Sequence, residues 1–167
     1  TIPSPINGLH PGREQNFPRG SHVRVPDSPP LRIKDSLTLQ AYIWPTTPEK
    51  GLQGIITKWT GDAGYGLFIG EDGCLSLRLG DKSGKVERVS TGVPLVTSQW
   101  YVVAATFDAT TGAVSLYQKP LSMWVTDDAH ATVQHETSLL GLGSNDAPLV
   151  IAGIADRDAS GKVAIGG

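Results

Sequence analysis

Polar and apolar residues alternate along several short stretches of this chain, which predicts β-strands. In residues 36–44, SLTLQAYIW, aliphatic side chains occupy every second position and Thr38, Gln40, Tyr42 and Trp44 lie between them. A period of two is typical of a strand, because successive side chains point to opposite faces. We therefore expect a strand here with one aliphatic face and one partly aromatic face.

Two hairpins are predicted farther along. Alternating runs flank Glu71-Asp72-Gly73, and Asp-Gly supplies the positive φ that a tight turn needs. A second pair of runs, 100–107 and 113–118, flanks a turn at 108–112. The first arm of this pair is almost continuously apolar, which favours a central strand covered on both faces.

Shorter runs at 23–25, 53–59, 86–92 and 148–154 are interpreted as further strands, the first as an edge strand stopped by Pro26. Residues 120–147 are the hardest to interpret, and a helical turn and a strand both stay open there. Short strands separated by frequent turns indicate an all-β sandwich or jelly roll. A chain of 167 residues suits one such domain.

The amino-acid composition argues against several classes of function. The net charge of −2 argues against a nucleic-acid or membrane surface, because both need basic patches. No apolar run approaches the roughly 20 residues that span a bilayer. Cys74 is the one cysteine, so an internal disulfide is excluded and a reducing, cytoplasmic location is expected.

The order of these segments resembles the laminin-G or concanavalin-A-like jelly roll, a sandwich of two antiparallel sheets. The resemblance rests on SLTLQAYIWP, GIITKW, GYGLFIGEDGCLSLRLG and QWYVVAATFDATTGAVSLYQ, and covers residues 21–154. Such jelly rolls continue with a strand after the last glycine-rich loop, whereas this sequence stops at Gly167. We therefore expect residues 1–167 to be one domain, excised from a longer chain and lacking its last strand.

A narrower resemblance is carried by FPRGSHVRVPDSPPL, YIWPTTPEKGLQGIITKW and VIAGIADRDASGKVAIGG. These look like the N-terminal region of the large subunit in the N,N-dimethylformamidase family of bacterial amide hydrolases. The resemblance implies a non-catalytic structural or assembly domain, whose partners are the rest of its own large subunit and a small subunit. It also implies that the parent cleaves the C–N bond of a formamide with an iron centre outside this chain.

Candidate contact residues are mainly aromatic. Tyr42 and Trp44 share a strand face, Trp124 lies in the segment that is hardest to interpret, and Arg157 lies in the loop ADRDASGKV. We interpret the Tyr42 and Trp44 face as packing or interdomain contact, and Trp100 as a core residue. The alternative is a carbohydrate-binding, lectin-like module, in which exposed aromatic rings would stack on a glycan.

Calcium at the rim of the sandwich is a further hypothesis, with Asp72, Asp108 and Asp146 as oxygen donors. The alternative is turn chemistry, because Asp often bonds its own backbone at such positions. We expect no other cofactor in this chain.

Catalysis by the chain itself is not expected. A glucanase of this fold would need clustered acids on one strand, and no predicted strand shows an acid-x-acid-x-x-acid pattern. Cys74 has no histidine base at short range and is interpreted as a small packed side chain. His130 and His135 are five apart, so on a strand they would face opposite sides.

Overall fold

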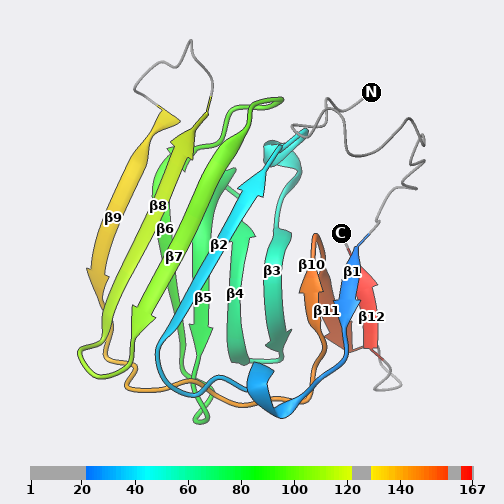
Figure 1. Ribbon diagram of the computed structural model, residues 1–167, viewed down its shortest axis with the longest axis vertical. Coiled ribbons are helices and arrows are strands. Elements are labelled where there is room, and N and C mark those ends of the chain that lie inside the picture. Colours follow the sequence, from blue (N-terminus) through cyan, green and yellow to red (C-terminus); the bar gives the residue numbers. More distant parts are fainter. Residues whose placement is uncertain (1–21, 122–128, 158–162, 167) are drawn as a thin grey trace.

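The computed structural model describes residues 22–121, 129–157 and 163–166, which form an all-β sandwich (Figure 1). The predicted fold class is confirmed. The strands are β1 (Val23–Val25), β2 (Leu37–Ile43), β3 (Gln53–Thr60), β4 (Ala63–Ile69), β5 (Cys74–Gly80), β6 (Val86–Pro94), β7 (Tyr101–Asp108), β8 (Ala113–Pro120), β9 (Ala131–Glu136), β10 (Leu149–Ile151), β11 (Ile154–Arg157) and β12 (Val163–Gly166). Two single-turn 3₁₀ helices, η1 (Pro29–Leu31) and η2 (Pro48–Lys50), lie in the connections. Neither of these described helices is long enough to cross a membrane.

Two antiparallel sheets make up the sandwich. One has six strands in the order β1-β10-β3-β4-β5-β6, and the other has four in the order β2-β7-β8-β9. In Figure 1 the four-stranded sheet lies in front of β3 to β6. Both predicted hairpins, β4–β5 and β7–β8, are confirmed, and Gly73 and Gly112 in their turns have φ of 73° and 74°.

The core lies between the two sheets and follows the alternation seen in the sequence. Leu75, Leu77 and Leu79 on β5 are at most 1% exposed. Val103 and Phe107 on β7 belong to the same buried cluster. Burying one such leucine contributes roughly 2 kcal/mol, so this layer fixes which face of each strand points inward.

The segment predicted as one strand, residues 148–154, is divided into two. β10 belongs to the six-stranded sheet, whereas β11 pairs with β12 in a separate two-stranded sheet. The break lies at Ala152, which has a φ of 61°, and Gly153, whose oxygen accepts a hydrogen bond from Thr57 Oγ1 at 2.9 Å. A Cβ on Gly54 would lie 2.1 Å from that same oxygen, so this close packing of β11 on β3 requires glycine at position 54.

Other elements also differ from the expectations. β6 extends to Pro94, and β9 is a strand within the segment that gave no clear pattern; residues 122–128 of that segment lie outside the described residues. β1 is an edge strand, as predicted. That a closing strand lies beyond Gly167 stays a prediction.

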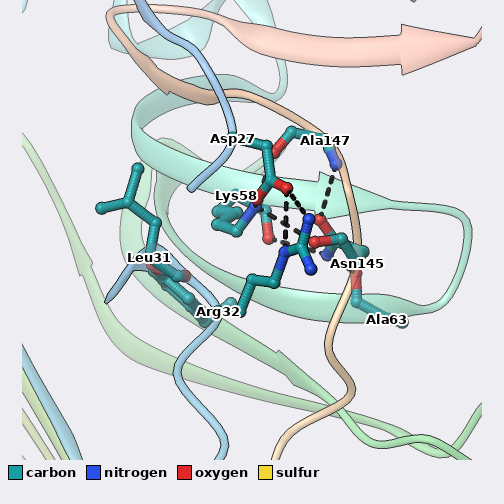
Figure 2. Close-up of polar contacts among 8 residues, drawn as sticks. Asp27, Leu31, Arg32, Lys58, Ala63, Asn145 and Ala147 are labelled. Atoms are coloured by element: carbon teal, nitrogen blue, oxygen red, sulfur yellow. Dashed lines mark hydrogen bonds and ion pairs between the residues drawn. The ribbon is translucent and has the colours of Figure 1, made fainter. Parts of the chain in front are cut away.

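A buried lysine ties several segments to one end of the six-stranded sheet. Lys58 on β3 is 1% exposed, and its ammonium group donates to Asp27 Oδ1 at 2.6 Å (Figure 2). It also donates to the backbone oxygens of Ala147, at 2.6 Å, and Asn145, at 3.2 Å. A buried ammonium is tolerated only when it is paired and hydrogen-bonded, and here all three donors have partners.

Neighbouring groups complete this cluster. Asp27 also accepts hydrogen bonds from Arg32, including one of 2.8 Å from Nε. The Asn145 side-chain amide donates to the oxygens of Ala63, at 2.9 Å, and Lys58, at 3.3 Å. The hydrogen bonds from Arg32 and Lys58 lower the pKa of Asp27 from 3.8 to about 2. The cluster therefore links the segment after β1 and the segment before β10 to β3 and β4.

Replacing Lys58 with methionine should destabilise the domain by about 3 kcal/mol, because Asp27 and two carbonyl oxygens lose their buried donor. Urea unfolding of the 167-residue chain would measure this. Lys119→Met is the matched control, since Lys119 is exposed on β8 and its loss should stay within about 0.5 kcal/mol. Equal effects of the two substitutions would contradict the proposed role of Lys58.

Stability should also fall in acid through Asp27. Its pKa in the folded chain, about 2, lies below the ordinary value of 3.8, so its stabilisation is complete above 3.8 and is lost as the pH falls through about 2. Urea midpoints measured across this window should decline more steeply for the wild-type chain than for Asp27→Asn. Parallel declines would show that Asp27 does not contribute.

Candidate functional site

An apolar groove lies where β2 ends and β7 begins. Its volume is about 710 Å³, and it is lined by Tyr42, Trp44, Thr97, Ser98, Gln99, Trp100 and Leu121. Tyr42 is 65% exposed and Leu121 is 48% exposed. The groove therefore presents aromatic and aliphatic surface to the outside of the four-stranded sheet.

Strand alternation places the aromatic rings there. Tyr42 lies between Ala41 and Ile43, which pack against the core, so its ring points outward. Trp44 follows the last residue of β2 and is half-buried. The expectation that Trp100 is a core residue is wrong: Tyr101 is the fully buried residue, and Trp100, one position earlier, lies on the groove side.

The groove wall is fixed by hydrogen bonds between its two segments. The Ser98 N–H donates to the oxygen of Pro45 at 2.7 Å, and Thr97 Oγ1 donates to the oxygen of Thr46, also at 2.7 Å. Ser98 has a φ of 57°, a conformation that costs an ordinary residue roughly 1 kcal/mol. The surrounding contacts therefore hold a strained turn at the edge of the groove.

The two tryptophans form the floor. The ring centroids of Trp44 and Trp100 lie 5.4 Å apart, and their planes are tilted by 56°. This tilted packing leaves no slot between two parallel rings, so a ligand would meet the exposed Tyr42 ring and the groove walls. Gln99, Thr97 and Ser98 add an amide and two hydroxyl groups at the rim.

Two predicted contact residues are not placed in this groove. Trp124 lies outside the described residues. Arg157 ends β11, where its backbone pairs with Val163, and its side chain lies outside the described atoms. Their roles as contact residues stay predictions.

The three predicted calcium ligands occupy separate elements. Asp72, in the β4–β5 turn, accepts a hydrogen bond from the Cys74 N–H at 3.2 Å. Asp108, which ends β7, accepts one from the Thr110 N–H at 2.8 Å, and this bond lowers its pKa. Asp146 is exposed between β9 and β10. The first two carboxylates thus make the turn contacts named as the alternative, and calcium binding stays a prediction.

Among the described ranges, no three His, Cys, Asp or Glu side chains come together as a metal-binding group. Cys74 is buried, and burial raises the pKa of its thiol. A protonated, buried thiol is a poor nucleophile, so Cys74 is a packed side chain, as expected.

These features define a concanavalin-A-like β-sandwich with an aromatic groove on the outside of its smaller sheet. The chain belongs to the Concanavalin A-like lectin/glucanases superfamily, whose sequence profile matches residues 17–151. In solved structures it is similar to the Ruminococcus gnavus IT-sialidase CBM40, with a TM-score of 0.47 and 18% identity over 82% of this chain and 72% of that chain. It is also similar to the botulinum neurotoxin serotype D binding domain, with a TM-score of 0.46 and 15% identity over 78% of this chain and 31% of that chain.

Similarity in sequence indicates a more specific relationship than similarity in structure. The chain is 32% identical to the N,N-dimethylformamidase beta subunit of Paracoccus aminophilus over 96% of its own length. It is also 32% identical, over 87% of its length, to the protein of the same name from an Alcaligenes species. It spans 22% of the length of each relative. The predicted resemblance to an N,N-dimethylformamidase subunit is thus confirmed, and the relatives name that subunit beta.

Removing the hydroxyl group of Tyr101 should destabilise the wall of the groove. Its oxygen accepts a hydrogen bond from the Val96 N–H at 2.9 Å, so Tyr101→Phe should cost about 1 kcal/mol and alter the fluorescence of the neighbouring tryptophans. Tyr42→Phe removes the same atom from an exposed ring and should cost less than about 0.5 kcal/mol. Urea unfolding followed by fluorescence compares the two, and equal costs would contradict this role of Tyr101.

Proposed function

We propose that this chain is a non-catalytic assembly module of a bacterial amide hydrolase similar to N,N-dimethylformamidase. The supporting observation is the groove beside Tyr42, which leaves aromatic surface exposed on the four-stranded sheet. A hollow of this kind is typical of a docking site. Its occupant would be another part of the parent subunit, because most of the length of the relatives lies outside the matched fifth.

The rest of the assignment extends this proposal with what the resemblance to the N,N-dimethylformamidase family implies. The parent would be the large subunit of the enzyme, would pair with a small subunit in the cytoplasm, and would hydrolyse a formamide to an amine and formate. An iron site would belong to the catalytic portion of the parent. This chain would then contribute binding surface and no reacting group.

A glutamate in the groove tests the docking proposal. In the isolated 167-residue chain, Tyr42→Glu should change stability by less than about 0.5 kcal/mol, because Tyr42 is exposed. In the whole parent subunit the same change should weaken docking by about 2 kcal/mol, because the new charge would be buried without a partner. Limited proteolysis and thermal unfolding of the parent would measure this.

The matched control is Leu140→Glu, which introduces the same charge at a residue that is 74% exposed and is not in the groove. This substitution should leave docking and thermal unfolding of the parent subunit unchanged. If the two glutamate variants behave alike in the parent, the groove is not the docking site.

A carbohydrate-binding module is the second candidate. One observation favours it: the exposed ring of Tyr42 shares the groove with the hydroxyl and amide groups of Thr97, Ser98 and Gln99. Glycan binding would change the emission of Trp44 and Trp100, so a fluorescence titration of the isolated chain against a glycan panel separates the candidates. Saturable binding that Tyr42→Ala abolishes would favour the lectin-like function, whereas the assembly module predicts no response.

A further inference from the structure

A second unusual surface lies on the opposite side of the sandwich, on the outer face of β4, β5 and β6. Leucines 75, 77 and 79 face the core, so Ser76 and Arg78 face outward, as the sequence predicts. The strand register places Ser76 opposite Ser90 and Arg78 opposite Arg88. Two arginines thus lie side by side on neighbouring strands, an arrangement that is destabilising unless the charge is compensated.

Phe68 forms the floor of this surface. It lies on β4 opposite Ser76 and is 1% exposed, although it faces away from the core. A Cβ on Gly66 would lie 2.6 Å from the Phe68 ring, so the ring packs closely on the bare strand at position 66. The guanidinium carbon of Arg78 lies over the same ring, 5.2 Å from its centroid. The guanidinium group is therefore held over an aromatic ring.

Arg78 has no carboxylate partner among the described residues. Its Nε is buried and makes no hydrogen bond there, and the ion pairs of the described ranges do not include it. Burial and the charge of Arg88 lower the pKa of Arg78. Arg88 has only a long contact of 3.9 Å with Asp72, and both of these side chains are well exposed. The charge of Glu71 also acts on Arg78, so the described carboxylates compensate the positive charge of this site only in part and make no close ion pair with it.

Ser76 supplies an independent observation at the same place. It is 0% exposed, and its hydroxyl group has no hydrogen-bond partner in the described chain. A buried hydroxyl without a partner is unfavourable and calls for an occupant such as a bound ion or water. The contrast with Lys58, whose three donors all have partners, shows that this fold can satisfy a buried cation when its own residues suffice.

We propose that Arg78 and Arg88 form a carboxylate-binding site on the outer face of the six-stranded sheet, with Phe68 as its floor and Ser76 as a further donor. A planar guanidinium edge matches the two oxygens of a planar carboxylate. The contact with the Phe68 ring helps to hold the Arg78 guanidinium group in place before the ligand arrives. β11 packs on β3 (Figure 1), and the Arg78 side chain on β5 is only partly buried, so a ligand would reach the site through the exposed part of this side chain.

Acetate is the probe for the site. In the 167-residue chain, the Nε–Hε NMR resonance of Arg78 should shift saturably as acetate replaces chloride at constant ionic strength. Arg78→Gln should weaken binding by roughly tenfold or more, read from backbone amides of β5 and β6, and Arg88→Gln should weaken it less. Arg24→Gln is the matched control, because it removes the same charge from exposed β1 and should leave binding unchanged.

Two further measurements keep the test decisive. Arg78→Lys keeps the charge and loses the fork, so it should bind acetate several-fold more weakly, and it provides a second folded variant if Arg78→Gln fails to fold. A blocked peptide Ala-Glu-Ala, compared with Ala-Gln-Ala, distinguishes a carboxylate carried by a polypeptide from a free one. Tighter binding of the Glu peptide than of acetate would identify a protein segment as the source, and weaker binding would identify a small molecule.

The proposal is overturned if Arg78 shows no saturable response to either carboxylate, or if Arg24→Gln weakens binding as much as Arg78→Gln. The second result would indicate general charge screening. These measurements use the isolated chain and do not involve the groove. The carboxylate site can therefore be disproved while the docking proposal stands, and the docking proposal can be disproved while the carboxylate site stands.

Discussion

The packing of one sheet on the other is the interaction on which the rest of the structure depends. Leu75, Leu77 and Leu79 face the four-stranded sheet across a buried core, and a strand cannot shift by one residue without turning this layer outward. That constraint decides the direction of every neighbouring side chain. It sends Tyr101 inward and Trp100 to the groove, and it sends Ser76 and Arg78 to the opposite surface. Both candidate binding surfaces are therefore consequences of core packing.

This also explains which features could be predicted from the sequence. Alternation and the Asp-Gly turn are local signals, so the β2 strand and the β4–β5 hairpin were predictable. The pairing of Lys58 with Asp27 joins residues 31 positions apart, and no local pattern predicts it. The open groove has the same origin, because Trp44 and Trp100 meet only after β2 pairs with β7. Trp100 was misplaced because an almost continuous apolar run hides the period of two.

Two cationic side chains among the described residues, Lys58 and Arg78, are partly or fully buried, and their charges are compensated differently. Lys58 lies where three segments converge, and each supplies an oxygen: a carboxylate from Asp27 and carbonyl groups from Asn145 and Ala147. Arg78 lies on a regular sheet, where the backbone oxygens are already used by the strand ladder and cannot turn toward it. Irregular segments between strands can therefore supply oxygens to a buried charge. A charge on a sheet face depends instead on side chains or on a ligand. Arg78 therefore indicates a binding site, whereas Lys58 has a structural role.

The groove and the arginine surface lie on opposite sheets, and this limits how the domain can be engaged. A single small ligand cannot contact both, because the whole core separates Tyr42 on β2 from Arg78 on β5. A lectin acting alone would need only one such surface. A module held between two other parts of a larger assembly would use both, with an apolar contact on the four-stranded sheet and an acidic contact on the six-stranded sheet. Apolar burial would provide most of the docking free energy, and the carboxylate would fix the orientation, because charge pairs contribute more to specificity than to affinity.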